Sequence, residues 1–100
     1  TVRSEIKESG RFTWKFDEDK MQFPLKKRRK KEGDLFYPIG MIGKKKISKF
    51  FKDEKIPILA QQKIWLLCDG NDKVLGIIPF RQDRRFAATK ESKAIIKVKL

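Results

Sequence analysis

The fold of this chain is decided by residues 33–51, GDLFYPIGMIGKKKISKFF. The first half is a short apolar run that predicts a strand closed by turn residues, and the second half has the spacing of a helix. Three apolar residues recur there at i, i+3 and i+4 and so share one helix face: Ile47, Phe50 and Phe51. The pattern predicts an amphipathic helix over about residues 45–54, which ends before Pro57 because proline interrupts helical hydrogen bonding.

Three consecutive lysines stand at the start of this predicted helix: Lys44, Lys45 and Lys46. The N-terminus of a helix carries the positive end of its dipole, so each lysine there is unfavourable by roughly 0.3–1 kcal/mol. Residues that break a local rule often serve a function, and a bound polyanion would turn this repulsion into attraction. We therefore expect the lysines to bind a polyanion. The structural turns around them are assigned to Gly33, Gly40 and Gly43.

Outside this stretch the chain has the patterns of strands on both sides of a helical pair. A second, shorter helix is predicted at 57–62, with proline in its first turn. Apolar or alternating runs predict strands at 11–16, 21–29, 64–68, 74–78, 84–89 and 94–100. We expect the first two of these strands to form a hairpin. The strands at 64–68 and 74–78, which flank the DGNDK turn, are expected to form another. The opening ten residues lack a period and are expected to be a frayed lead-in.

The order of these elements predicts a single small α+β domain, with a mixed or antiparallel sheet and the short helical pair packed on one face. We divide the chain into residues 1–21, a lead-in with the first strand, and residues 22–100, the domain proper. One hundred residues provide enough chain for one core.

Positive charge is concentrated in one part of the chain. The whole sequence has 26 Lys and Arg against 13 Asp and Glu, a formal charge of +13. Residues 26–52 alone hold eleven basic and two acidic side chains, whereas residues 1–25 are balanced. Such a patch is typical of nucleic-acid binders. Two other readings are open, a lysine-rich face kept for solubility and an anionic membrane surface, although no long basic amphipathic helix is visible.

Composition argues against catalysis by this chain alone. It contains no histidine, the commonest general base, and a single cysteine, Cys68, in the apolar run IWLLC, where a small buried thiol is expected. No metal site or catalytic residue is predicted. The sequence has no apolar run of about 18 residues and no signal-peptide pattern, so a cytoplasmic protein without a membrane anchor is expected.

The glycine segment is compared with two phosphate-binding motifs. A P-loop requires glycine five residues before Gly43 and a hydroxyl residue after Lys44, but the chain has Pro38 and Lys45 there. The four residues from Gly40 to Gly43 have the G-x-x-G form of KH domains, yet a strand rather than a helix is predicted before them. Both patterns therefore match poorly.

Other basic residues are candidates on charge alone. Arg81, Arg84 and Arg85 lie in a connection after a predicted strand, where guanidinium groups can bind phosphates, and Asp83 can hold one of them in an internal pair. Arg28 and Arg29 belong to the basic tract at residues 26–31, and if this tract is a strand only about half of its side chains can serve one surface. Lys49 lies one turn into the predicted helix.

The combined spacing of several motifs resembles the C-terminal domain of tRNA(Ile)-lysidine synthetase over about residues 22–100. The motifs are Gly33-Asp34, Tyr37-Pro38-Ile39-Gly40-Met41, Gly43-Lys44-Lys45-Lys46, Phe50-Phe51, Lys55-Ile56-Pro57 and Arg81-x-Asp83-x-Arg85-Phe86. The chain departs from the family pattern at Pro79, where glycine is common, and at Gln82, where an aliphatic residue is common.

The resemblance implies that this chain is a tRNA-recognition domain that engages the acceptor-stem side. Enzymes of the family use ATP to attach lysine to the wobble cytidine of tRNA(Ile), in a separate N-terminal catalytic domain. ATP and magnesium are expected in that domain and no cofactor in this one. The expected RNA-binding residues are Lys44, Lys45, Lys46, Lys49, Arg28, Arg29, Arg81 and Arg85, with Asp83 as a structural turn residue. The alternative is a module that docks onto neighbouring domains or forms a homodimer without touching RNA.

Overall fold

The computed structural model describes residues 2–7 and 13–99. The strands are β1 (Val2–Lys7), β2 (Thr13–Asp17), β3 (Lys26–Arg28), β4 (Leu35–Phe36), β5 (Lys45–Lys46), β6 (Trp65–Cys68), β7 (Val74–Ile78), β8 (Arg81–Gln82) and β9 (Ile95–Lys99). The helices are α1 (Ile47–Asp53), α2 (Ile58–Gln61) and a 3-10 turn at Glu18–Lys20. The α+β class and the short helical pair are confirmed. Among the described residues, no helix is long and apolar enough to cross a membrane.

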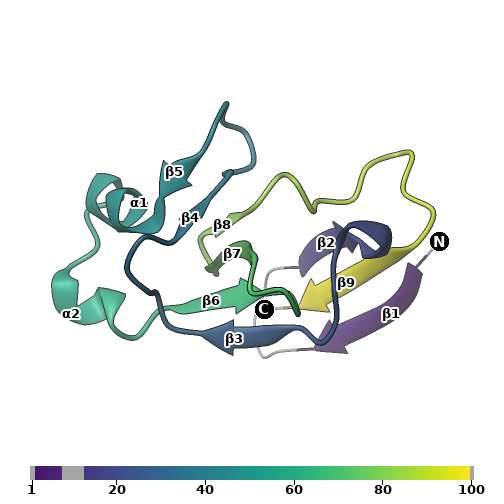
Figure 1. Ribbon diagram of the computed structural model, residues 1–100, viewed down its shortest axis with the longest axis horizontal. Coiled ribbons are helices and arrows are strands. Elements are labelled where there is room, and N and C mark those ends of the chain that lie inside the picture. Colours follow the sequence, from purple (N-terminus) through teal and green to yellow (C-terminus); the bar gives the residue numbers. More distant parts are fainter. Residues whose placement is uncertain (1, 8–12, 100) are drawn as a thin grey trace.

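The described strands form three sheets rather than one (Figure 1). The first has the order β1-β9-β2, and β9 runs parallel to β1 and antiparallel to β2. The second has the order β3-β6-β7-β8 and is antiparallel throughout. The third is the short hairpin β4-β5, which stands at the top of the molecule in Figure 1.

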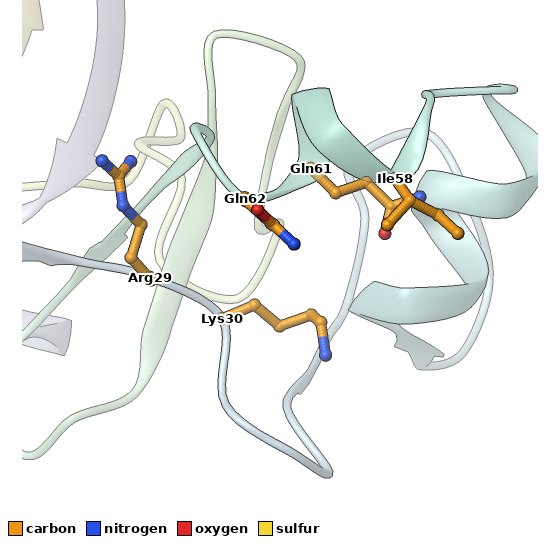
Figure 2. A pocket seen from close by; sticks show the side chains of 5 residues that line it. All are labelled: Arg29, Lys30, Ile58, Gln61 and Gln62. Atoms are coloured by element: carbon orange, nitrogen blue, oxygen red, sulfur yellow. The ribbon is translucent and has the colours of Figure 1, made fainter.

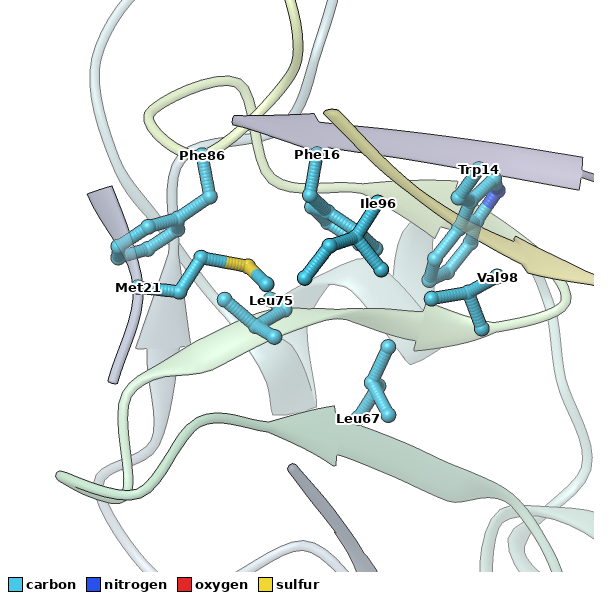
Figure 3. Close-up of a cluster of buried hydrophobic side chains, with 8 residues drawn as sticks. All are labelled: Trp14, Phe16, Met21, Leu67, Leu75, Phe86, Ile96 and Val98. Carbon is cyan, nitrogen blue, oxygen red and sulfur yellow. The ribbon is translucent and has the colours of Figure 1, made fainter. Parts of the chain in front are cut away.

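The four-stranded sheet is covered on both faces, which explains why its central strands are almost continuously apolar. Adjacent residues of β6 point to opposite sides, so Leu67 enters one cluster of buried side chains and Leu66 the other. The first cluster lies between the two larger sheets (Figure 3) and consists of Trp14, Phe16, Met21, Leu67, Leu75, Phe86, Ile96 and Val98. The second joins the sheet to α1 and β4 and consists of Phe36, Ile47, Phe50, Phe51, Leu66, Cys68, Val74 and Ile77.

The β6-β7 hairpin closes as its turn residues predict. Asp69 is buried at the turn, where its Oδ1 accepts hydrogen bonds from the N–H groups of Asn71 and Lys73. Its Oδ2 accepts a further one from Gln22 N–H. Cys68, beside it, is buried as expected, and desolvation raises the pKa of its thiol to about 11. This thiol is therefore a packing group and not a reactive one.

One predicted strand is wrong in part, another is wrong throughout, and one segment without a predicted strand contains one. Of the strand predicted at 21–29 only Lys26–Arg28 forms, as β3. Residues 21–25 are not a strand, because the backbone of Gln22 bonds to the β6-β7 turn and Pro24 has no N–H to donate. Residues 84–89 turn, and Ala87 makes an isolated bridge to Phe16. The expected lead-in contains β1, whereas residues 1 and 8–12, including the start of the predicted strand 11–16, lie outside the described residues.

The predicted pairing of the first two strands is also wrong. β2 lies against β9, with Trp14 opposite Val98 and Phe16 opposite Ile96, and β3 lies against β6. The pairing with β9 places Trp14 and Phe16 in the first cluster, and the predicted hairpin of residues 11–16 with 21–29 does not form.

Candidate nucleic-acid interface

The hairpin β4-β5 sorts the three lysines onto two faces. Lys45 pairs with Phe36, which is buried in the second cluster, and both point toward α1. The Lys45 Nζ lies 2.6 Å from Asp53 Oδ2 and 5.7 Å from the centre of the Phe50 ring, and the side chain is 15% exposed. The hydrogen bond from Lys45 lowers the pKa of Asp53. Lys45 is therefore held by the domain itself.

Lys44 and Lys46 are exposed. Neither forms an ion pair with a residue of the described ranges. The helix begins at Ile47 and not at residue 45, so Lys44 and Lys45 precede it, and Lys46 is its N-cap. The predicted start of the helix at residue 45 is thus two residues early, and the three lysines immediately precede its first helical residue. The Ile47 N–H donates to the carbonyl oxygen of Asp34 at 3.0 Å, which extends the hairpin ladder into the helix.

Tyr37 lies on the same face of the hairpin as these two lysines. Lys46 is opposite Leu35, and side chains two residues apart along extended chain share a face, so Tyr37 and Lys44 continue it. Two guanidinium groups flank the Tyr37 ring: the Cζ of Arg85 is 4.1 Å and that of Arg84 5.1 Å from its centre. Tyr37 is not among the predicted site residues. Its spacing of two residues from Leu35 indicates the shared face only when the pairing of β4 with β5 is known.

Asp83 is the residue that fixes this cluster. It is fully buried, and its Oδ2 accepts hydrogen bonds from the Tyr37 N–H at 2.9 Å and from Arg85 Nη2 at 3.0 Å. Its Oδ1 accepts from the Arg85 N–H at 2.8 Å and Nε at 3.1 Å. The carboxylate thus joins the turn after β8 to the end of β4, and the partner of Asp83 is Arg85 rather than Arg81.

Arg81 lies at the base of the loop between β4 and β5. Its Nη1 donates to the carbonyl oxygen of Ile39 at 3.2 Å, and the backbone of Gln82 accepts the Ile39 N–H at 2.9 Å. Gly40 and Gly43 in this loop have φ of 83° and 82°, the left-handed region that favours glycine. Gly33, with φ of 83°, lies in the turn before β4.

Lys49 is one turn into α1 and exposed, with its Nζ 3.5 Å from Asp53 Oδ1. Asp53 therefore bridges Lys45 and Lys49. Solvent reaches this outer pair, so it contributes little to stability.

Arg28 belongs to an internal ion-pair network that joins β3 to the turn before β4 and to the β6-β7 turn. Its Nη1 and Nη2 donate to the two carboxylate oxygens of Asp34 at 2.8 and 3.0 Å, and its Nε donates to Asp72 at 2.7 Å. The side chain is 12% exposed. The hydrogen bonds that Arg28 donates to Asp34 and then to Asp72 raise the pKa of Arg28, and its bond to Asp72 lowers the pKa of that carboxyl to about 2. Burial alone would raise the pKa of Asp34, but the bonds from Arg28 and the Lys31 N–H lower it.

Arg29 stacks on Trp65, with its Cζ 3.5 Å from the ring centre, and its Nη1 donates to the Lys63 carbonyl at 2.7 Å. It lines a hollow of about 350 Å³ between the end of β3 and α2. Figure 2 shows Lys30, Ile58, Gln61 and Gln62 around the same hollow. Arg28 thus has its partners in the turn before β4 and in the β6-β7 turn, and Arg29 has its partners on β6 and just before it. Lys44 and Lys46 stand on or beside β5, Arg81 contacts the hairpin loop, and Arg85 contacts Tyr37.

Comparisons with known proteins agree with this architecture. The family model described as "TilS substrate C-terminal domain" matches residues 25–99. The tRNA(Ile)-lysidine synthase of Parabacteroides distasonis is 38% identical over 96 residues, which are 96% of this chain and 22% of that protein. That of Clostridium tetani is 38% identical over 85 residues, 85% of this chain and 18% of that protein. The chain therefore spans about a fifth of the length of these relatives.

Solved structures show the same fold. The crystal structure of a TilS C-terminal domain superposes with a TM-score of 0.72 at 24% identity, over 88% of this chain and 67% of that one. An N-terminal fragment of the phenylalanyl-tRNA synthetase β-subunit from Pyrococcus horikoshii gives a TM-score of 0.67 at 18% identity, over 85% of this chain and 26% of that one. At these identities the likeness concerns the fold. The family model and the sequence relatives confirm the resemblance drawn from the sequence: the chain belongs to the family of TilS substrate C-terminal domains.

Proposed function

We propose that this chain is a tRNA-recognition domain of a tRNA(Ile)-lysidine synthase. The hairpin face, by which we mean the side of β4-β5 that carries Tyr37, Lys44 and Lys46 together with Arg85, binds the RNA backbone on the acceptor-stem side. The observation that carries the proposal is the sorting of the lysines. Lys44 and Lys46 are exposed on the face that also presents Tyr37 and Arg85, while Lys45 is turned inward onto Asp53. Solubility alone gives no reason for exposed cations to gather around one hairpin.

The chemistry of this face suits phosphate groups. Lysine ammonium groups and arginine guanidinium groups donate charge-assisted hydrogen bonds to phosphate oxygens, and Arg85 is pre-oriented by Asp83. Double-stranded RNA hides its base edges in a deep, narrow major groove, so a domain with these donors is suited to recognising backbone and shape. Lys49 and Arg81 extend the proposed surface on either side, whereas Arg28 is assigned to the stability of the domain.

The proposal gives this chain no reaction of its own. Its sequence contains no histidine, and among the described residues no group of His, Cys, Asp or Glu could hold a metal ion. The ATP- and magnesium-dependent ligation of lysine to tRNA(Ile) is assigned to an N-terminal catalytic domain of a longer cytoplasmic enzyme. That catalytic domain is proposed to be joined to this one in the same polypeptide. The relatives named above are four to six times longer than the segment they share with this chain, as their covered fractions of 22% and 18% indicate.

The test compares two lysine variants that differ in the face they affect. Binding of tRNA(Ile) to the 100-residue chain is measured at several salt concentrations for the wild type, for Lys44→Gln with Lys46→Gln, and for Lys45→Gln. Log affinity falls as log salt rises, and each lost phosphate contact is expected to make this negative slope shallower by about 0.7–0.9. We expect a loss of one to two such steps for the double variant, and an unchanged slope for Lys45→Gln with a lower melting temperature.

The control variant also separates the alternatives. If both lysine variants keep the wild-type slope, the hairpin face does not contact phosphate and the proposal fails. If the wild type shows little affinity at any salt concentration, the domain is a docking module rather than an RNA-binding one.

A further inference from the structure

The loop between β4 and β5 presents apolar side chains to solvent. Ile42 is fully exposed, and Ile39 and Met41 are 41% and 40% exposed. In Figure 1 this loop projects beyond the sheets, away from both termini. Large apolar side chains that cluster at a projecting tip add nothing to the cores, and clusters of this kind are typical of interaction sites.

Hydrogen bonds hold the backbone of the loop at Ile39 and Met41. Ile39 is fixed through both its backbone groups, by Gln82 and Arg81, and the Met41 N–H donates to the Pro38 carbonyl at 3.2 Å. Pro38 itself bridges Asp83. A tip whose backbone is already ordered loses little conformational entropy on binding, which favours its use as a contact.

Cations flank the apolar tip. Lys44 follows it two residues after Ile42, and Arg81 contacts its base at Ile39. A matching partner is apolar at its centre and anionic around it. An unpaired nucleobase fits both conditions, because its flat face is apolar and its own and neighbouring phosphates carry the charge. Isoleucine and methionine are among the residues that nucleic-acid-binding proteins place against base faces.

We propose that Ile42 and Met41 pack against the face of an unpaired nucleobase while Lys44 and Arg81 contact the phosphates beside it. This inference rests on the proposed RNA-binding function and adds a base contact to it. In this arrangement the hairpin face binds the phosphate backbone of an RNA helix, and the tip contacts a single-stranded nucleotide next to that helix.

The experiment compares two RNAs that carry the same phosphates. One is a short stem with a four-nucleotide single-stranded extension, and the other is the same molecule with abasic nucleotides in the extension. Affinity for the 100-residue chain is measured for the wild type, for Ile42→Ser, and for Leu59→Ser as a matched control, because Leu59 is also exposed but lies on α2. Both side chains lie outside the two clusters of buried residues, so folding is preserved, and a thermal melt verifies it.

We expect the wild type to bind the base-bearing RNA about tenfold more tightly than the abasic RNA, in line with burial of one large apolar side chain. Ile42→Ser should lose that preference and keep the salt slope, since no phosphate contact is removed. Leu59→Ser should behave as the wild type does.

Each other result has a definite meaning. Equal wild-type affinity for the two RNAs, or a preference that survives Ile42→Ser, overturns the base contact, and the tip then belongs to a protein–protein contact. A loss of affinity that is equal for both RNAs also overturns it. Absence of salt-dependent binding of the wild type to either RNA instead refutes the proposed RNA-binding function.

Discussion

Replacement of Asp83 by alanine tests whether one buried carboxylate holds the hairpin face together. The change removes the acceptor for the backbone N–H groups of Tyr37 and Arg85 and for the Arg85 guanidinium. The bonds to the Tyr37 and Arg85 N–H groups are partly buried, and an N–H left without a partner inside the protein costs up to about 1–3 kcal/mol. The Arg85 side chain is 36% exposed, so water can replace its lost contacts and its share is small. We therefore expect Asp83→Ala to lower the free energy of unfolding by about 3 kcal/mol.

Urea denaturation followed by tryptophan fluorescence measures this loss. The dependence on urea should keep its slope while the midpoint falls, because the change affects stability and not the surface exposed on unfolding. Asp83→Asn retains one oxygen acceptor and should lose about half as much as Asp83→Ala. Arg85→Gln, which leaves Asp83 bonded to the backbone, should lose less than about 1 kcal/mol.

The reasoning fails if Asp83→Ala unfolds within about 1 kcal/mol of the wild type, since that would mean the two N–H groups find other partners at no cost. It also fails if Arg85→Gln is as destabilising as Asp83→Ala. In that case the ion pair, and not the backbone bonds, would be what matters at this turn.

Two further predictions concern packing and acid stability. Gly76→Ala should lower stability by about 1–3 kcal/mol in thermal melts, because the added Cβ would lie 2.5 Å from the Trp14 ring, and an unchanged melting temperature would contradict the described packing. Arg28 lowers the pKa of Asp72 to about 2 in the folded state, whereas the pKa of an aspartate in the unfolded chain is about 4. The stability that this ion pair provides is therefore complete above about pH 4 and is lost as the pH falls toward 2. Urea midpoints measured from pH 5 to pH 2 should fall along that range, and Arg28→Met should flatten the decline; equal declines in the two proteins would argue against the ion pair as its source.

Local patterns predicted the elements whose signal lies within about ten residues of sequence. The helix expected at 45–54 is α1, the one at 57–62 contains α2, and the apolar runs at 64–68 and 74–78 pair across their turn as β6 and β7. In each case periodicity and turn chemistry determine the outcome locally. The α+β class followed from the order of these elements.

Strand pairing could not be predicted in the same way. The alternation of Trp14 and Phe16 indicates a half-buried strand, but it does not say which strand lies beside it. The partner is β9, about eighty residues further along the chain, and the nearby run at 21–29 is instead bound to β6 and the β6-β7 turn.

The candidate site shows the same limit in its charges. Lys44, Lys45 and Lys46 look equivalent in sequence, and only the register of β5 against β4 turns the middle one toward Asp53. Arg28 looks like one more cation of a basic tract, yet one of its partners, Asp72, is 44 residues away. Ion pairs of this kind depend on the fold and leave no local signal.

The hairpin that carries the proposed interface is too short to orient itself. A ladder of two residue pairs is at best marginally stable, so its direction is set by what it is attached to. Phe36 anchors one face in the second cluster, Asp83 holds the strand beyond it, and the Ile47 N–H ties the start of α1 to the turn before β4. The inward face is thereby committed to packing, which leaves Lys44, Lys46 and the apolar tip as the groups free to meet a partner. The same anchors that stabilise the domain therefore determine which of its cations can reach a phosphate.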